Sequence, residues 1–143
     1  MTDQSIEQDI QAAGKTAPRI TPKDIENNIV SELYFTAGDG VIGAFAASEF
    51  KKTSGDITLQ AGVAHPDLLK DSLKLLTFCV LVLRNGFTVT GESACASPAN
   101  FSEEIGRKIA LANAISKIWP LMGYALKSEL TGNTTVLQRA RDE

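Results

Sequence analysis

The side chains best suited to chemistry lie between residues 84 and 113. They are two arginines, a lysine, two phenylalanines and an asparagine: Arg84, Phe87, Phe101, Arg107, Lys108 and Asn113. An arginine fork fits phosphate oxygens, a phenylalanine ring can stack on a base, and an asparagine amide can pair with an adenine edge. Together they indicate a nucleotide-like ligand. The simpler alternative, which residue types alone favour, is that both phenylalanines are core and the basic residues lie on a solvated helix face.

Residue sets typical of enzymes are missing from the sequence. A serine triad would need His65, the only histidine, and there is no nucleophile elbow. There is also no P-loop and no helix with two metal-binding histidines. Glu92, Glu103 and Glu104 could act as acid and base, but solvated carboxylates are the simpler interpretation. We therefore expect a protein that is not an enzyme and that needs no cofactor or metal.

Composition narrows the class of protein further. A chain of 143 residues with 43% hydrophobic content fits one compact domain. A net charge of −3 argues against a partner that is a long nucleic acid. No segment has the roughly 18 continuous apolar residues of a membrane span, and the acidic N-terminus is unlike a signal peptide, so we expect a cytoplasmic location. Cys79 is interpreted as a small buried hydrophobe, and no disulfide with Cys95 is expected.

The best-patterned segment predicts an α+β fold around a central hairpin at about residues 75–92. Leu75 to Leu83 is rich in β-favouring residues, Asn85-Gly86 supplies positive φ values for a tight turn, and a second strand begins at Phe87. The first strand is apolar on both faces. Such a strand is usually covered by helices on one side and often by another subunit on the other.

Helices are predicted on both sides of this hairpin in the sequence, and we expect them to pack on the sheet. Thr21-Pro22-Lys23-Asp24 is a helix start, followed by an apolar stripe at helical spacing, which predicts a helix at about 22–35. C-terminal helices are predicted at about 102–119 and 120–130. Pro120 separates them, because proline cannot continue an unbroken helix.

The rest of the chain has weaker signals. Residues 1–20 are expected to be a flexible arm, 21–131 a single ligand-binding and oligomerisation domain, and 132–143 a polar tail. Shorter predictions are a glycine-rich turn at 38–43, despite its G-x-G-x-x-G spacing, a short strand at 57–59 and a helical turn at 67–74.

The chain resembles a family of small bacteriophage proteins over the run LTFCVLVLRNGFTVTGESACASPANF, followed by EIGRKIA, NAISKIWPL and GY. The preceding TPKDIENNIVSELYFTA resembles the N-terminal helix of that family. The resemblance covers residues 18–130, within which residues 37–70 look variable.

That family is similar to the first type of Thoeris anti-defence proteins, phage proteins that sequester cyclic ADP-ribose signals made by bacterial TIR immune enzymes. Some also hold cyclic oligonucleotides. The resemblance implies a sponge in the host cell cytoplasm: a dimer-based homo-oligomer, up to a hexamer, that binds a cyclic nucleotide signal at subunit contacts without cleaving it. The ligand-binding residues it implies lie in matching motifs: Arg84, Phe87, Asn100, Phe101, Arg107, Lys108 and Asn113. Leu111-Ala112 stands where the family often has a charged residue, which can alter a pocket or an interface.

Two other functions stay open at this point. An interaction protein that binds a host or phage protein, with no small-molecule pocket, would explain the same apolar strand and low net charge. A hydrolase acting on the signal comes third, because the nucleophile and metal sets are missing.

Overall fold

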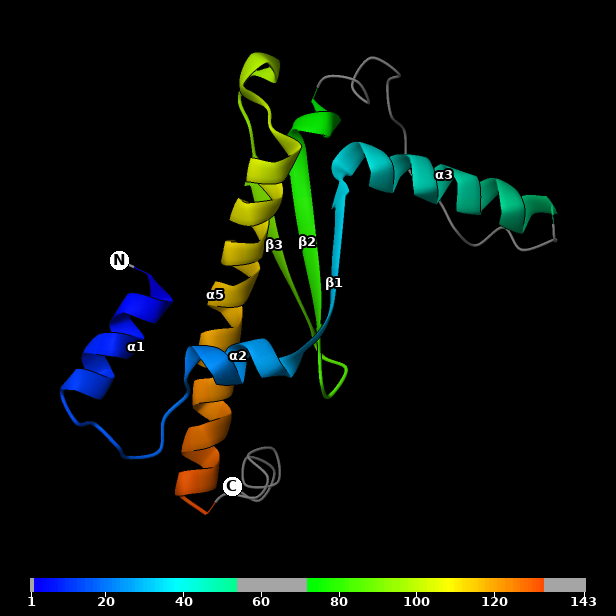
Figure 1. The fold of residues 1–143 in the computed structure, drawn as a ribbon. Coiled ribbons are helices and arrows are strands. Elements are labelled where there is room, and N and C mark those ends of the chain that lie inside the picture. Colours follow the sequence, from blue (N-terminus) through cyan, green and yellow to red (C-terminus); the bar gives the residue numbers. More distant parts are fainter. Residues whose placement is uncertain (1, 54–71, 133–143) are drawn as a thin grey trace, which may run out of the picture.

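The computed structural model describes residues 2–53 and 72–132, which form a small sheet with one long helix across it (Figure 1). Residues 1, 54–71 and 133–143 lie outside the described part, and with them the predicted strand at 57–59. The elements, in chain order, are α1 (Asp3–Ala12), α2 (Pro22–Asn28), β1 (Ile29–Thr36), α3 (Ala37–Thr53), the 3₁₀ turn η1 (Leu73–Leu75), β2 (Leu76–Leu83), β3 (Thr88–Ala94), the 3₁₀ turn η2 (Pro98–Asn100) and α5 (Glu103–Leu130).

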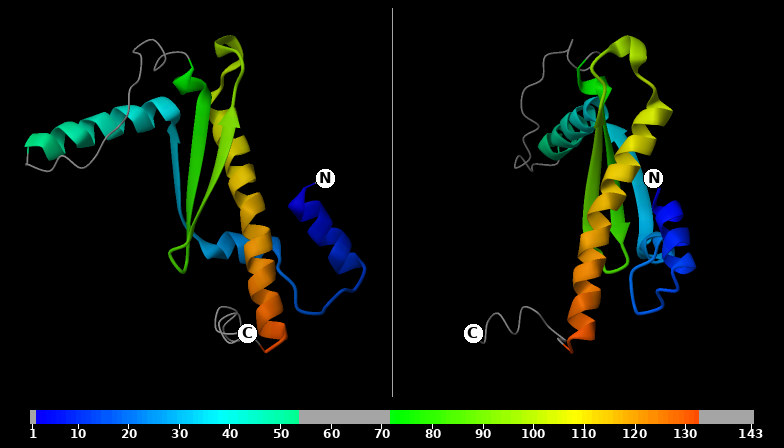
Figure 2. Two further views of the ribbon diagram at one scale, coloured as in Figure 1. Left: turned by 180° about the vertical axis from the view of Figure 1, so that it is seen from behind. Right: turned by 90° about the vertical axis from the view of Figure 1, so that its left-hand side faces the viewer.

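The sheet has three antiparallel strands in the order β1-β2-β3. Tyr34 of β1 pairs with Cys79 of β2, which in turn pairs with Gly91 of β3. Helix α5 covers one face, and no helix of the described residues covers the other (Figure 2). The prediction of an α+β fold with a central hairpin and a C-terminal helix on the sheet is confirmed.

The hairpin turn depends on one glycine. Gly86 has φ of 86°, and no residue other than glycine in the described chain has a positive φ. The Gly86 amide donates to the Leu83 carbonyl at 2.9 Å, and the Leu83 amide donates to the Phe87 carbonyl at 2.8 Å. The turn therefore has three residues and ends in a left-handed glycine, one of the common hairpin types. Asn85 keeps a negative φ, and its side-chain oxygen accepts from the Phe87 amide at 2.9 Å.

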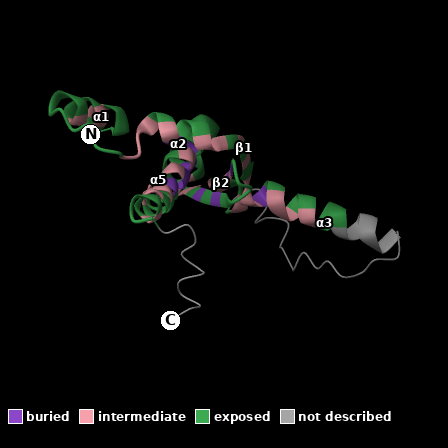
Figure 3. Ribbon diagram, turned by 90° about the horizontal axis from the view of Figure 1, so that it is seen from below, coloured by how far each residue is buried: buried purple, intermediate pink, exposed green. Residues whose placement is uncertain are grey.

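The core lies between this hairpin and α5. Small residues let the helix approach the sheet closely, and the buried positions on α5 recur at every fourth residue: Gly106, Ala110, Ala114 and Ile118. Alternate residues of β2 face them, with Cys79 and Leu81 fully buried (Figure 3). The prediction that Cys79 is a buried hydrophobe is confirmed, and both cysteines are free thiols.

The helix predicted at 22–35 is wrong in its second half. The start is confirmed, because Thr21 and Asp24 form a reciprocal capping box, with the Asp24 carboxylate accepting from the Thr21 amide at 2.9 Å. The helix ends at Asn28, and Ile29–Thr36 continues as strand β1. The run IVSELYFT is rich in β-branched and aromatic residues, and pairing with β2 overrides its helical spacing.

The predicted break at Pro120 is also wrong, because α5 runs without interruption from Glu103 to Leu130. Pro120 has no N–H to donate to the Ser116 carbonyl. Both residues are exposed, so water can donate a hydrogen bond to that carbonyl, and the missing intrahelical hydrogen bond does not break the helix. By length and composition α5 could also cross a membrane, but core helices of soluble proteins meet the same criteria, and here α5 packs on the sheet.

Two N-terminal predictions need correction as well. The expected arm at 1–20 contains helix α1, which begins with a Thr2–Ser5 capping box but has no buried residue. The glycine-rich segment at 38–43 lies inside α3 and forms no turn. Small side chains there let Phe35 pack against the helix, with its ring 3.5 Å from a Cβ placed on Gly40. The helical turn predicted at 67–74 overlaps the described part at η1.

Candidate ligand-binding site

The structure distributes the predicted site residues over separate parts of the molecule. Arg84 and Phe87 lie at the hairpin turn, whereas Asn100 and Phe101 lie in and beside η2, just before α5. Arg107 and Lys108 lie on the flank of α5 next to β1, and Asn113 lies on the opposite flank next to β3. One chain therefore does not bring them into a single pocket.

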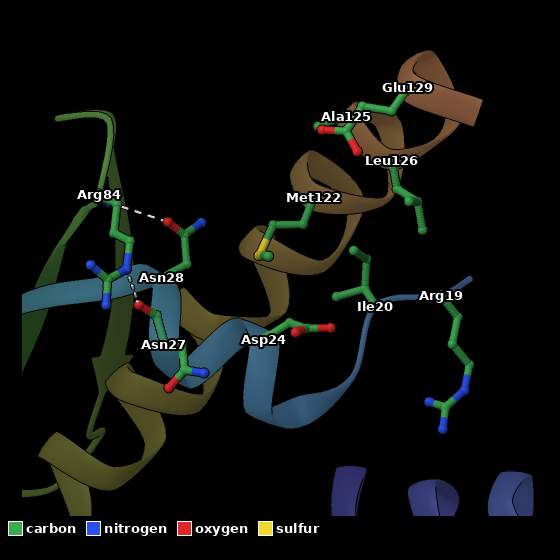
Figure 4. A pocket seen from close by; sticks show the side chains of 10 residues that line it. All are labelled: Arg19, Ile20, Asp24, Asn27, Asn28, Arg84, Met122, Ala125, Leu126 and Glu129. Carbon is green, nitrogen blue, oxygen red and sulfur yellow. Dashed lines mark hydrogen bonds between the residues drawn. The ribbon is translucent and has the colours of Figure 1, made fainter. Parts of the chain in front are cut away.

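Arg84 is bound to the end of α2. Its Nε donates to the Asn27 carbonyl at 2.6 Å, and its backbone amide donates to the Asn28 side-chain oxygen at 3.2 Å (Figure 4). The same amide also lies 3.0 Å from the Asn28 backbone carbonyl. These contacts satisfy carbonyls that a helix leaves open at its C-terminus. Arg84 borders a shallow cavity of about 490 Å³, with Arg19 at the far end of the cavity (Figure 4). Arg19 is itself paired with Glu7.

Phe87 and Phe101 differ in burial. Phe87 is 56% exposed, so its interpretation as a core residue is wrong and its ring is available for contacts. Phe101 is half-buried and lines a small cavity near the start of α5, together with Asn100.

The most ligand-like group of side chains surrounds Arg107. Its guanidinium carbon lies 5.8 Å from the centroid of the Tyr34 ring, within the range of a cation–π contact. A shallow pocket of about 450 Å³ is lined by Tyr34, Leu111, the two cations and the carboxylates of Glu103 and Glu104. Both cations have exposed partners one turn earlier, at 3.3 Å for Arg107–Glu103 and 3.2 Å for Lys108–Glu104.

Tyr34 is the residue of this pocket that the sequence did not indicate. Its hydroxyl donates to the Glu32 carboxylate at 3.1 Å. Burial, assisted by that negatively charged acceptor, raises the pKa of Tyr34 far above its usual value, so the phenol stays neutral at physiological pH. Tyr34 was missed because the sequence predicts a helix at about 22–35. The residue lies instead in strand β1, which brings its ring next to Arg107 of α5.

Asn113 contributes to the fold. Its Nδ2 donates to the Glu92 carbonyl at 2.8 Å and so connects α5 with the outer strand of the sheet. An edge strand leaves such carbonyls unpaired unless another group covers them.

Nothing in the described part of the chain provides an activated nucleophile. Burial raises the pKa of the Cys79 thiol, so the reactive thiolate form is disfavoured. Within residues 2–53 and 72–132 no cluster of three or more His, Cys, Asp or Glu residues could hold a metal ion. The charged and aromatic side chains described above are suited to binding.

A comparison with protein families identifies the origin of the chain. The model of the phage protein (N4 Gp49/phage Sf6 gene 66) family matches residues 20–130. The chain belongs to this family. The match begins just before α2 and ends at the last residue of α5, so it covers the whole sheet and its helix. Searches of curated proteins and of solved structures found no match.

Proposed function

We propose that this member of the phage family binds and sequesters a cyclic nucleotide immune signal in the host cytoplasm without cleaving it. The sequence resemblance to Thoeris anti-defence proteins suggests cyclic ADP-ribose isomers, and cyclic oligonucleotides are the second ligand class. The observation that carries the proposal is the pocket in which Arg107 stands over Tyr34 beside Lys108.

This pocket suits a phosphate-containing ligand for a simple energetic reason. The Arg107 side chain is 51% exposed and its partner Glu103 is 66% exposed. Such exposed pairs contribute only a few tenths of a kcal/mol, so exchanging Glu103 for a phosphate costs little. An arginine binds phosphate through two parallel hydrogen bonds, which are stronger than neutral ones. The apolar Leu111 and the Tyr34 ring supply surface for a sugar or a base.

A homo-oligomer is part of the proposal. On the sheet face opposite α5, Leu33 is 54% exposed and Phe35 is 37% exposed. Phe78, Val80 and Val82 of β2 lie on the same face and are only partly buried. Helix α3 extends away from the sheet and exposes Ile42 and Phe45 (Figure 1). A second copy of the chain is the partner that we propose covers these apolar residues.

Calorimetry tests the binding step. Titration of the intact protein with cyclic ADP-ribose isomers and with cyclic di- and trinucleotides should give saturable binding to at least one of them. The ligand recovered after heat denaturation should be chemically intact. No binding to any of them, at concentrations that preserve the assembly, contradicts the proposal, and a degraded ligand indicates an enzyme.

The open sheet face also supports a second function, an interaction protein that binds a host or phage protein. An apolar patch of this kind is typical of a protein interface. A pull-down that recovers one stoichiometric host partner and no nucleotide would favour this alternative.

A further inference from the structure

A groove lies between the outer edge of strand β3 and helix α5. Its volume is about 520 Å³. It is lined by Thr88–Thr90 of the strand and by Lys117, Pro120, Leu121 and Tyr124 of the helix. Leu121 is 39% exposed and Tyr124 is 63% exposed, so the helix side of the groove offers apolar and aromatic surface to a partner.

The edge of β3 beside this groove has open main-chain groups. Among the described strands, β3 pairs only with β2. The Phe87 carbonyl bonds toward β2, and main-chain groups alternate in direction along a strand. Those of Thr88, Thr90 and Glu92 therefore point away from β2. The side chain of Asn113 covers the outward Glu92 carbonyl at 2.8 Å, whereas the outward groups of Thr88 and Thr90 have no partner strand within the described chain.

The helix side of the groove adds an open acceptor and a charge. Pro120 has no N–H for the exposed Ser116 carbonyl, so a main-chain acceptor of α5 is open next to the groove. Lys117 is the only charged residue that lines the groove. No carboxylate of residues 2–53 and 72–132 forms an ion pair with it. A carboxylate of a partner would therefore meet this ammonium group without a competitor from the described chain.

We propose that this groove binds an extended, acidic segment of another protein as a fourth strand, antiparallel to β3. The main chain of the segment bonds to Thr88 and Thr90, and a carboxylate of the segment pairs with Lys117. Its alternate side chains contact Leu121 and Tyr124. In strand addition, main-chain bonds give affinity and alternate side chains give specificity. A helix does not fit these observations, because its main-chain groups are bonded internally and cannot pair with an open edge.

The probe is the fluorescein-labelled heptapeptide ETVTVTE. In an extended chain its glutamates and valines share one face, and its symmetry places a carboxylate at either end. Fluorescence anisotropy with the intact protein should show saturable binding. Lys117→Glu should weaken this binding at least about fivefold, because an attraction becomes a repulsion. The matched control is Lys127→Glu, an exposed lysine of the same helix outside the groove, which should bind the peptide like the wild type.

Methylation of the peptide amides tests the main-chain bonds. In an antiparallel pair, residues opposite Thr88 and Thr90 share their face and their bonding direction, so the threonine amides of the peptide donate to β3. A peptide with N-methylated threonines should therefore not bind, whereas one with N-methylated valines should retain binding. Equal binding of the two methylated peptides, or no saturable binding of the unmodified one, overturns the inference.

A second copy of the chain is the other candidate occupant of this edge. Thr90→Pro removes one outward N–H, and edge strands tolerate a proline whose missing N–H would face outward. This variant should lose peptide binding but keep the wild-type molar mass in light scattering. A lower mass would place a second copy on the edge of β3 and overturn the inference. If the variant fails to fold, the methylated peptides still decide the question.

Discussion

Gly91 of β3 lies directly against the backbone of Ala110 in α5. A Cβ on Gly91 would be 2.0 Å from the Ala110 carbonyl oxygen and 2.3 Å from the Ala114 amide nitrogen. No side chain fits in that space, so the helix and the sheet are in backbone contact. This contact sets the distance between α5 and the sheet, and with it the positions of the residues on both flanks of the helix.

The first prediction concerns this contact. Gly91→Ala should lower the free energy of unfolding by at least about 3 kcal/mol, because backbone atoms must move to admit the methyl group. The control is Gly123→Ala, where a Cβ meets nothing within 4 Å. That variant should raise stability by about 0.5–1 kcal/mol through helix propensity. Urea unfolding followed by circular dichroism measures both, and equal stability of the two variants would refute the close contact.

The second prediction distinguishes a ligand-binding role for Arg107 from a structural role for Arg84. Arg107→Ala should weaken ligand binding at least about tenfold, since a charge-assisted bidentate contact is lost. Its melting temperature should hardly change, because its pair with Glu103 is exposed. Arg84→Ala should instead lower stability by about 1 kcal/mol, because the carbonyl at the end of α2 loses its donor.

Calorimetry and thermal melting on the same preparations distinguish these effects. Arg107→Lys serves as a second control and should bind with intermediate affinity, because it keeps the charge without the fork. Unchanged affinity in Arg107→Ala would show that the site lies elsewhere.

The third prediction tests the open face of the sheet. Leu33→Lys should reduce the molar mass in solution by breaking the assembly, because burying an unpaired ammonium in an apolar interface is costly. Leu130→Lys is the matched control: Leu130 is 56% exposed, close to the 54% of Leu33, but it lies at the far end of α5. Light scattering should find the wild-type mass for the control only. A wild-type protein that is already a monomer would rule out this interface.

The fourth prediction concerns pH and helix α1. Arg19 donates to both Glu7 oxygens, at 2.5 and 2.6 Å, and this contact lowers the pKa of Glu7 below its ordinary value of 4.5. The contact therefore stabilises the docked helix above pH 4.5, and this stabilisation is lost as the pH falls through the lowered pKa.

Trp119 reports on this change, because it is the only tryptophan and its indole N–H donates to Asp3 of α1 at 3.2 Å. Its fluorescence should shift to longer wavelength as the solution is acidified below pH 4.5. In Glu7→Gln the acid-dependent shift should be smaller and the emission at neutral pH already red-shifted. Identical titrations of both proteins would show that Glu7 does not hold α1.

Local signals predicted the hairpin and the helix starts. Asn85-Gly86 and the β-favouring runs on either side of it were visible in the sequence because turn chemistry and strand composition are local. The segment from Ile29 to Tyr34 misled because its helical spacing coincides with a β-favouring composition. Only the hydrogen bonds to β2, about fifty residues further along, decide the outcome. The helix break predicted at Pro120 was wrong because the energetic cost of a proline inside a helix depends on whether the carbonyl left without a donor is exposed to water. That exposure is decided by how the whole helix packs on the sheet.

The candidate site was predictable only in part. Arg107 and Lys108 stand out by residue type and lie in a pocket with an aromatic ring. The ring belongs to Tyr34, which lies over seventy positions away, and no local pattern indicates that contact. Arg84 and Asn113 have hydrogen bonds to backbone carbonyls that residue types could not reveal.

Native mass spectrometry of the protein mixed with cyclic ADP-ribose isomers and cyclic oligonucleotides tests the central claim most directly. It gives the number of subunits and the mass of any bound ligand in one spectrum. We expect an oligomer that carries ligand of unchanged mass. A monomer with no ligand bound from any of these mixtures, or a ligand whose mass has increased by one water, would contradict sequestration.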